Sequence, residues 1–213
     1  MEEEFYKNLK KEILHYFEAT GGHEISHTER VYNLAMTIAK TESVDLDILK
    51  ASALLHDIAR KKESNKEIKC HADEGSKMAK EILKKTSFPK EKVNEVVYAI
   101  KVHRYSKGII PETIEAKILQ DADRLDALGA ISFGRIFSFD GKHGIPIHNP
   151  KILPKEKYTA KKDTSGINHF YEKIVKLKPE TFHTKKAKEF AKNRYKFSKD
   201  FVEEFIAEWN GER

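Results

Sequence analysis

Apolar residues recur along most of this 213-residue chain at spacings of three and four positions, which is the period of an amphipathic helix. Val31, Leu34 and Ile38 are one example, and Val93, Val96 and Ile100 are another. We find no convincing alternation of apolar and polar residues, the pattern typical of strands. The sequence therefore predicts an all-α fold, a helical bundle with helices near residues 3–20, 26–43, 46–59, 71–85, 89–103, 111–129, 167–177 and 184–208.

Two further local signals refine this prediction. Asp45 precedes the third predicted helix and is expected to be its N-cap. Between residues 133 and 163, six glycines and prolines interrupt the helical pattern, and we expect a long functional or mobile loop there. The chain length fits one domain over residues 1–213, with a core at about 20–140 and a basic helical extension at about 160–213 packed on it.

Composition narrows the classes of protein and their surroundings. Cys70 is the single cysteine, so no intrachain disulfide can form, and a reducing compartment is favoured. We see neither a signal peptide nor a membrane-spanning run, and we expect a cytoplasmic protein that does not bind membranes. Residues 151–213 carry 16 basic and 10 acidic side chains, which is the whole net charge of +6. Because basic and aromatic residues do not alternate there, nucleic acid is not the expected partner.

Histidine and aspartate residues lie in line with the apolar faces of five predicted helices. Each position, taken alone, is that of an ordinary core or surface residue. Together they place imidazoles and carboxylates where the helices are expected to converge. The residues are His27, then His56 and Asp57, then His71, then His103, and finally Asp121, Asp123 and Asp126.

Burial of these carboxylates requires a compensating positive charge. An ionised carboxylate buried without partners costs several kcal/mol. A divalent metal ion is the simplest cation that compensates several of them at once. Imidazole mixed with carboxylate suits Mn, Fe, Co, Ni or Zn, and Mg, which suits this mixture less well, stays among the candidates. The sequence therefore predicts a divalent metal ion as cofactor.

At this point the sequence resembles a known family. The order of His27, His56-Asp57 and Asp123 is similar to the signature of the HD-domain metal-dependent phosphohydrolases. The segments HTERVYNLA, ALLHDIAR, HADEGSKMAKEIL and QDADRLDALGA agree as well, and they are most similar to the small stand-alone members, some of which act on nucleoside triphosphates. The resemblance covers about residues 20–140 and extends more loosely to about residue 195.

The resemblance implies a ligand set and a reaction. His27, His56, Asp57 and Asp123 are the matching metal ligands, and Asp57 is also expected to orient a metal-activated water or accept its proton. The expected reaction is hydrolysis of a phosphate ester or anhydride bond. The expected partner is a small phosphorylated substrate, above all a nucleotide, and the protein is expected to be a monomer or a homodimer.

His71 and His103 leave a second arrangement open. Two-metal members of the family use extra histidines at about these places, with the aspartate of the His-Asp pair bridging the ions. The phosphodiesterase branch often has a His-His pair at the second place, whereas this chain has His103 followed by Arg104. We therefore favour one metal ion, with a second site at His71 and His103 as the alternative. With one ion, these histidines are catalytic: they contact substrate or act as general acid.

Candidate substrate-binding residues lie close in sequence to the expected ligands. Arg104 suits a phosphate because its planar guanidinium matches the phosphate oxygens. Lys61 follows the His-Asp pair by one helical turn. Lys107, Asp126 and Arg135 complete the set. The alternative for each is an ordinary charge, solvated at the surface or held in an ion pair.

Two other functions remain open. An HD-type di-iron oxygenase uses the same kinds of ligand, although nothing in the sequence indicates a pocket for it. A non-catalytic protein that binds nucleotide or nucleic acid is the other alternative. The intact ligand set argues against it, because a binding protein has no need of all four. The sequence does not identify the substrate, because the fold does not distinguish among phosphate esters.

Overall fold

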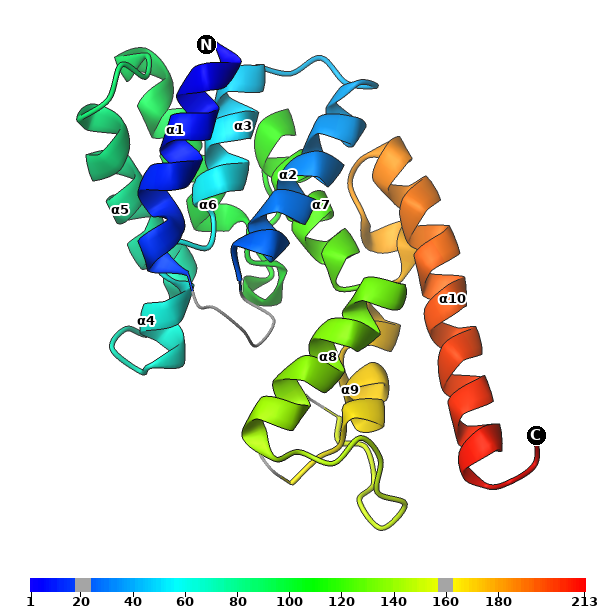
Figure 1. Ribbon diagram of the computed structural model, residues 1–213. Coiled ribbons are helices and arrows are strands. Elements are labelled where there is room, and N and C mark those ends of the chain that lie inside the picture. The colour runs from blue at the N-terminus through cyan, green and yellow to red at the C-terminus, as the bar shows by residue number, and fades with distance from the viewer. Residues whose placement is uncertain (18–23, 157–162) are drawn as a thin grey trace. The chain divides into compact units, whose positions relative to one another are not determined.

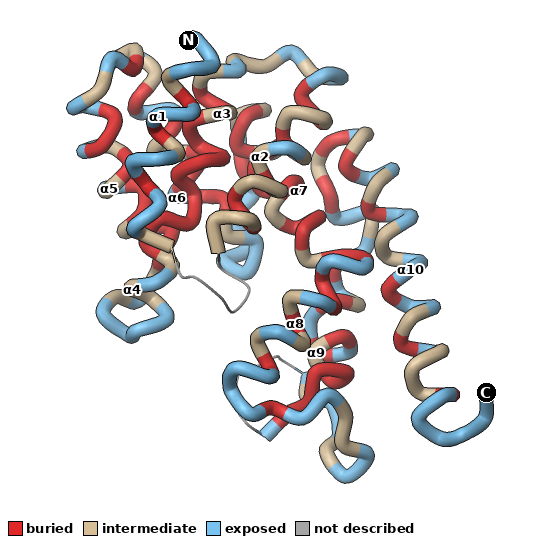
Figure 2. The backbone as a smooth tube through the Cα atoms, viewed as in Figure 1, coloured by how far each residue is buried: buried red, intermediate tan, exposed pale blue. Residues whose placement is uncertain are grey.

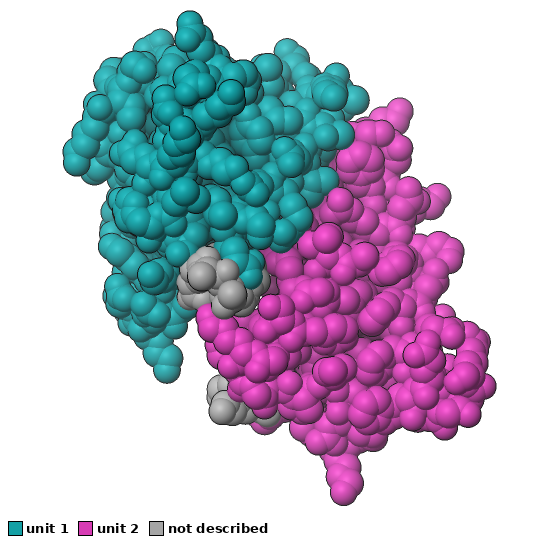
Figure 3. Space-filling model, in the orientation of Figure 1, with its two compact units in different colours: residues 1–123 teal, residues 124–213 magenta. Residues whose placement is uncertain are grey.

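The computed structural model describes residues 1–17, 24–156 and 163–213. Its described residues form helices, turns and irregular segments, and none of them lies in a β-strand, so the prediction of an all-α fold is confirmed. The chain divides into two compact units, Met1–Asp123 and Arg124–Arg213 (Figure 3). The interpretation of residues 1–213 as one domain with a packed extension stays a prediction.

The described residues of the first unit form six complete helices and the greater part of a seventh, which are labelled in Figure 1. Short 3-10 turns join several of them. The predicted helix at 3–20 ends earlier than expected, at Ile13, and residues 18–20 lie outside the described part of the chain. The bounds are Glu3–Ile13 for α1, Ile25–Ala39 for α2, Leu46–Leu55 for α3, Arg60–Ser64 for α4, His71–Lys84 for α5, Val93–Val102 for α6 and Ile114–Asp126 for α7.

Helix α3 is deeply buried, because it is apolar on nearly every side. Seven of its ten residues are buried, and the helix packs against α1, α2, α5 and α6 (Figure 2). Its N-terminus is capped as predicted: the Asp45 carboxylate accepts hydrogen bonds from the backbone amides of Asp47 (2.9 Å) and Ile48 (3.3 Å). The helix stops at Leu55, so His56 and Asp57 lie in the turn that follows it rather than inside a helix.

The core of the first unit joins α3 to α1, α5 and α6. Ile13, Leu55, Leu83, Phe88 and Ile100 are all at most 1% exposed and belong to one cluster. Each such side chain contributes about 1.5–3 kcal/mol relative to an exposed one. The cluster anchors α3, α5 and α6, and His56, His71 and His103 lie at ends of these helices.

The second unit is built from α8 (Ala130–His143), α9 (Gly166–Glu172) and α10 (Lys185–Trp209). Helix α10 begins at the N-cap Thr184, whose hydroxyl accepts a hydrogen bond from the Ala187 amide. Helix α8 contacts both α9 and α10. Aromatic rings join the elements: the ring centroids of Phe133 on α8 and Phe201 on α10 are 4.0 Å apart.

The expected loop over residues 133–163 is wrong for its first third, where α8 continues to His143. Phe133, Ile136 and Asp140 keep a helical spacing and are buried. Gly134 and Gly141 lie on the exposed side, where a missing side chain costs no packing. The helix ends at Gly144, which has a positive φ of 66°.

Within the described parts of the chain, no helix combines the length and the apolar character that a membrane span requires.

Candidate metal centre

Six side chains of the first unit, four histidines and two aspartates, meet around the end of α3. His56 is the C-cap of α3 and is fully buried, and Asp57 is 6% exposed. His27 comes from the first turn of α2, and Asp123 comes from α7. His71 opens α5, and His103 is the C-cap of α6.

The first triad consists of His27, His56 and Asp57. The Nε2 atoms of the two histidines are 3.4 Å apart. Asp57 directs Oδ2 toward both, at 3.6 Å from His27 Nε2 and 4.0 Å from His56 Nε2. One ligand atom from each residue lies within 4.8 Å of the others, so the three can hold one metal ion.

Asp123 joins the first triad. Its Oδ1 atom lies 3.4 Å from His27 Nε2, and its side chain is 29% exposed. The structure thus brings together all four ligands that the family resemblance implies. Asp121, the alternative carboxylate two positions earlier, is fully buried.

A second triad shares Asp57 with the first. It consists of Asp57, His71 and His103, whose ligand atoms also lie within 4.8 Å of one another. Here the other carboxylate oxygen, Oδ1, lies 3.3 Å from His71 Nε2 and 3.8 Å from His103 Nε2. The Nε2 atoms of these two histidines are 3.4 Å apart.

Hydrogen bonds at the far side of two rings determine where their protons lie. The Nδ1 atom of His56 is 2.8 Å from the Ala53 carbonyl oxygen, and that of His103 is 2.6 Å from the Ile100 carbonyl oxygen. A carbonyl oxygen only accepts, so both Nδ1 atoms carry the proton and both Nε2 atoms present lone pairs to the centre. Converging lone pairs and carboxylates repel one another unless a cation lies between them.

The electrostatics favour the protonation states that metal binding needs. Burial lowers the pKa of His56, and burial together with the neighbouring His56 lowers the pKa of His103 to about 4. Burial alone would raise the pKa of Asp57, but His56, His71 and Arg60 hold it well below its ordinary value. Burial alone would also raise the pKa of Asp123, but the hydrogen bond from His27 outweighs this effect and lowers the pKa. At neutral pH His56 and His103 are therefore neutral imidazoles beside charged carboxylates, the forms that bind metals.

The predicted phosphate-binding residues of the first unit lie in different settings. Arg104 is half-buried, and its guanidinium donates to Glu63 Oε1 (2.6 Å) and to the Ser106 hydroxyl (3.0 Å). Lys107 forms an exposed ion pair with Asp73 at 2.7 Å. Lys61 is exposed on α4.

Asp126 and Arg135 lie in the second unit and bind one another. The guanidinium of Arg135 donates to Asp126 Oδ2 at 2.7 Å, and the Asp126 side chain is 1% exposed. The carboxylate of Asp126 thus has a structural partner. Substrate binding by these two residues stays a prediction.

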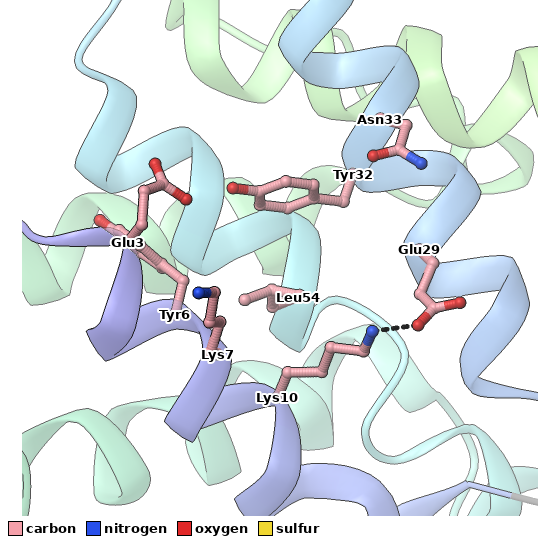
Figure 4. Close-up of a pocket in the computed structure, with 8 residues that line it drawn as sticks. All are labelled: Glu3, Tyr6, Lys7, Lys10, Glu29, Tyr32, Asn33 and Leu54. Carbon is pink, nitrogen blue, oxygen red and sulfur yellow. Dashed lines mark ion pairs between the residues drawn. The ribbon is translucent and has the colours of Figure 1, made fainter.

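A cavity of about 310 Å³ lies elsewhere in the first unit (Figure 4). It is lined by α1, α2 and α3, and the ion pair of Lys10 with Glu29 closes one side. None of the six residues of the metal centre lines this cavity, and neither does any predicted substrate-binding residue.

Sequence reasoning missed Glu63 and Arg60. Glu63 Oε2 lies 2.5 Å from His71 Nδ1 and 2.7 Å from Arg60. Both residues belong to the charged run Arg60-Lys61-Lys62-Glu63, which the sequence pattern indicates only as a polar turn. Nothing in the sequence itself separates Glu63 from its charged neighbours, because its partner depends on the packing of α4 against α5.

The chain is similar to known proteins over most of its length. The family model of the HD domain matches residues 25–128. An uncharacterized Bacillus subtilis protein, YpgQ, is 30% identical over 190 residues, which cover 86% of this chain and 82% of YpgQ.

Solved structures share the fold. An HD-superfamily hydrolase from Bacillus thuringiensis superposes with a TM-score of 0.74 at 32% identity, covering 97% of this chain and 96% of that one. A crystal structure of YpgQ in complex with ADP superposes with a TM-score of 0.68 at 26% identity, covering 95% and 97%.

Proposed function

Because the chain belongs to the HD-domain superfamily, we propose that it is a metal-dependent phosphohydrolase that acts on a nucleotide or another small phosphate ester or anhydride. The observation that supports this proposal most directly is the convergence of four histidines and two aspartates on the end of α3. A divalent cation is the simplest compensation for such a set of buried ligands.

His27, His56, Asp57 and Asp123 would hold one ion, and Asp57, His71 and His103 would hold another. A bound divalent ion supplies Lewis acidity: it lowers the pKa of water and offsets negative charge on phosphoryl oxygens. Our sequence interpretation favours one ion. Two triads that share Asp57 support the two-ion alternative, and metal stoichiometry decides between them.

The remaining groups of the first unit supply charge and orientation. In this proposal Asp57, ionised and buried, holds the ligand histidines in place and orients the attacking water. Arg104 retains guanidinium donors beyond those used by Glu63 and Ser106, and these suit phosphate oxygens. Lys61 and Lys107 would raise the local concentration of an anionic substrate.

The nucleotide class is supported by a relative. YpgQ, which shares the fold, forms a crystalline complex with ADP. A nucleoside diphosphate is an anion of the kind that Arg104 and the neighbouring lysines would attract. We therefore place nucleotides first among the substrates to be tested.

The test is release of phosphate or pyrophosphate from a panel of nucleoside mono-, di- and triphosphates and a generic phosphodiester, each with Mn²⁺, Mg²⁺, Co²⁺, Ni²⁺ and Zn²⁺. The protein is purified without a histidine tag. His56→Ala is the inactivating variant, and His15→Ala, at an exposed histidine, is the matched control. Release by the wild type and by His15→Ala alone supports the proposal. Equal release by His56→Ala, or no release with any metal and substrate, would overturn it.

A further inference from the structure

One carboxylate outside the two triads holds three donors at once. Glu63 Oε2 lies 2.5 Å from His71 Nδ1 and 2.7 Å from a guanidinium nitrogen of Arg60, and Oε1 lies 2.6 Å from a guanidinium nitrogen of Arg104. The Glu63 side chain is 18% exposed. Two guanidinium groups within hydrogen-bond distance of the carboxylate favour its anionic form, which accepts hydrogen bonds and donates none.

His71 needs this acceptor because of its place in the fold. His56 and His103 close the C-terminal ends of α3 and α6, where the carbonyl oxygens three residues earlier accept their Nδ1 protons. His71 opens α5, and a helix N-terminus exposes amide groups rather than carbonyl oxygens. A side chain must supply the acceptor there, and Glu63 of α4 supplies it.

Arg60 offers His71 Nδ1 a second hydrogen-bond partner, so either tautomer of the ring could form a hydrogen bond there. Its guanidinium nitrogen lies 2.9 Å from His71 Nδ1, close enough to donate to an unprotonated Nδ1. A lone pair on Nδ1 would, however, face the Glu63 carboxylate at 2.5 Å and be repelled. With Glu63 in place, the proton therefore lies on Nδ1, and Arg60 donates to the carboxylate instead.

We propose that Glu63 is a positioning residue of the metal centre, which fixes His71 in the tautomer protonated at Nδ1. The Nε2 lone pair then points toward Asp57 Oδ1 and His103 Nε2, as a metal ligand must. The tautomer of His71 is a property of the metal-free protein. Only its role, to present a metal ligand, rests on the proposed function.

Removal of Glu63 should reverse the tautomer. In Glu63→Ala the guanidinium of Arg60 becomes the nearest partner of Nδ1 and donates to it. The proton then moves to Nε2, where Asp57 Oδ1 accepts it at 3.3 Å. The second triad loses one lone pair. Glu63→Gln keeps an amide oxygen that can accept from Nδ1, so it should retain the wild-type tautomer.

The direct test is long-range ¹H–¹⁵N correlation spectroscopy of the histidine rings in the metal-free full-length protein above neutral pH. We expect His71 to show a protonated Nδ1 in the wild type and in Glu63→Gln, and a protonated Nε2 in Glu63→Ala. Glu67→Ala, which removes an exposed glutamate from the following turn, is the matched control. An unchanged His71 tautomer in folded Glu63→Ala, or a protonated Nε2 in the wild type, would overturn the inference.

Cobalt titration followed by absorbance adds an independent readout. We expect Glu63→Ala to weaken Co²⁺ binding at the second triad by about 10–100-fold while the first triad keeps its affinity. Equal affinities in the variant and the wild type would contradict the role of Glu63 in metal binding. Wild-type protein that binds none of Mn²⁺, Mg²⁺, Co²⁺, Ni²⁺ and Zn²⁺ would overturn the proposed function, whereas the NMR result would still decide the tautomer.

Discussion

The Oδ1 atom of Asp57 lies 3.3 Å from Nε2 of His71, while the other oxygen of the same carboxylate faces His27 at 3.6 Å. One side chain therefore serves both triads. Its two oxygens point to different histidine pairs, so Asp57 links any ion bound at one triad to an ion bound at the other. The predictions on Tm, on the two triads and on metal content depend on this arrangement of Asp57.

Metal binding should stabilise the fold. An ion that binds only the folded protein contributes about 2.7 kcal/mol when its concentration is 100 times its Kd. We expect the Tm of the wild type to rise with Mn²⁺ and to return to its original value with EDTA, and we expect the Tm of Asp57→Asn to stay constant. Scanning calorimetry measures this. A Tm of Asp57→Asn that rises as much as that of the wild type would contradict the role of Asp57.

The two triads should respond differently to loss of one histidine. His71 belongs to the second triad only, and His27 belongs to the first. If both triads bind, His71→Ala should retain the ion of the first triad, and His27→Ala should retain the ion of the second. Elemental analysis of the two variants checks this. Complete loss of metal from His71→Ala would mean that His71 supports the first triad as well.

Asp140 of α8 should make stability depend on pH. Its side chain is buried, its Oδ2 atom has no hydrogen-bond partner, and burial raises its pKa to about 6. Because the pKa of Asp140 is higher in the folded protein, its protonated carboxyl group contributes to the free energy of unfolding. This contribution is complete below the ordinary pKa of 3.8 and is lost as the pH rises through 6. Asp140→Asn should therefore stabilise the protein by about 2–3 kcal/mol at pH about 8 and change little at pH about 4.

Urea unfolding of the wild type and of Asp140→Asn at these two pH values measures the difference in their free energies of unfolding. Asp200→Asn, which changes an exposed aspartate on α10, is the control and should differ little from the wild type at either pH. Equal destabilisation of Asp140→Asn at both pH values would indicate a packing defect instead of relief of a buried charge.

Lys92 should contribute stability with the opposite pH dependence. It forms ion pairs of 2.8 Å with Asp45 and with Asp47, at the start of α3. Burial would raise the pKa of Asp47, but hydrogen bonds from Lys92, the N-terminal amine and Tyr6 lower it. A lowered pKa contributes stability that is present above the ordinary value of 3.8 and lost as the pH falls below it. Lys92→Met should cost about 1–2 kcal/mol at neutral pH.

The effect of Lys92→Met should shrink as the pH falls below about 4, because the carboxylates of the unfolded chain take up protons there before the ion-paired carboxylates of the folded protein do. Lys84→Met is the control, because the Lys84–Glu81 pair is exposed and should contribute little to stability. A cost for Lys92→Met that stays constant down to the lowest pH would show that the carboxylates are not its source.

The convergence of the histidine and aspartate side chains was largely predictable because its signal is local. A histidine such as His27 or His103 in line with an apolar stripe is visible in the sequence, and burial of that stripe carries the imidazole into the interior. No local signal indicates the two-sided use of Asp57, which entered only as the two-metal alternative that the family resemblance leaves open. It depends on α3 ending at Leu55, which leaves His56 and Asp57 in a turn between α2, α5 and α6.

Other features depend on contacts that the sequence pattern does not encode. Glu63 pairs with His71 and Arg104 across 8 and 41 positions, so only the packed structure reveals it. Helix α8 was missed because its glycines indicate a loop, although Gly134 and Gly141 lie on its exposed side. The same limit applies to Asp126, whose partner Arg135 is one of several nearby basic residues in the sequence.

The most direct test of the account is the metal content of protein purified without a histidine tag, compared between the wild type and Asp57→Asn by elemental analysis. The account predicts one or two equivalents of a divalent transition metal, or of Mg²⁺ after reconstitution, in the wild type, and almost none in Asp57→Asn. Wild-type protein that retains no metal after reconstitution with any of these ions, or Asp57→Asn protein that retains as much as the wild type, would contradict the account.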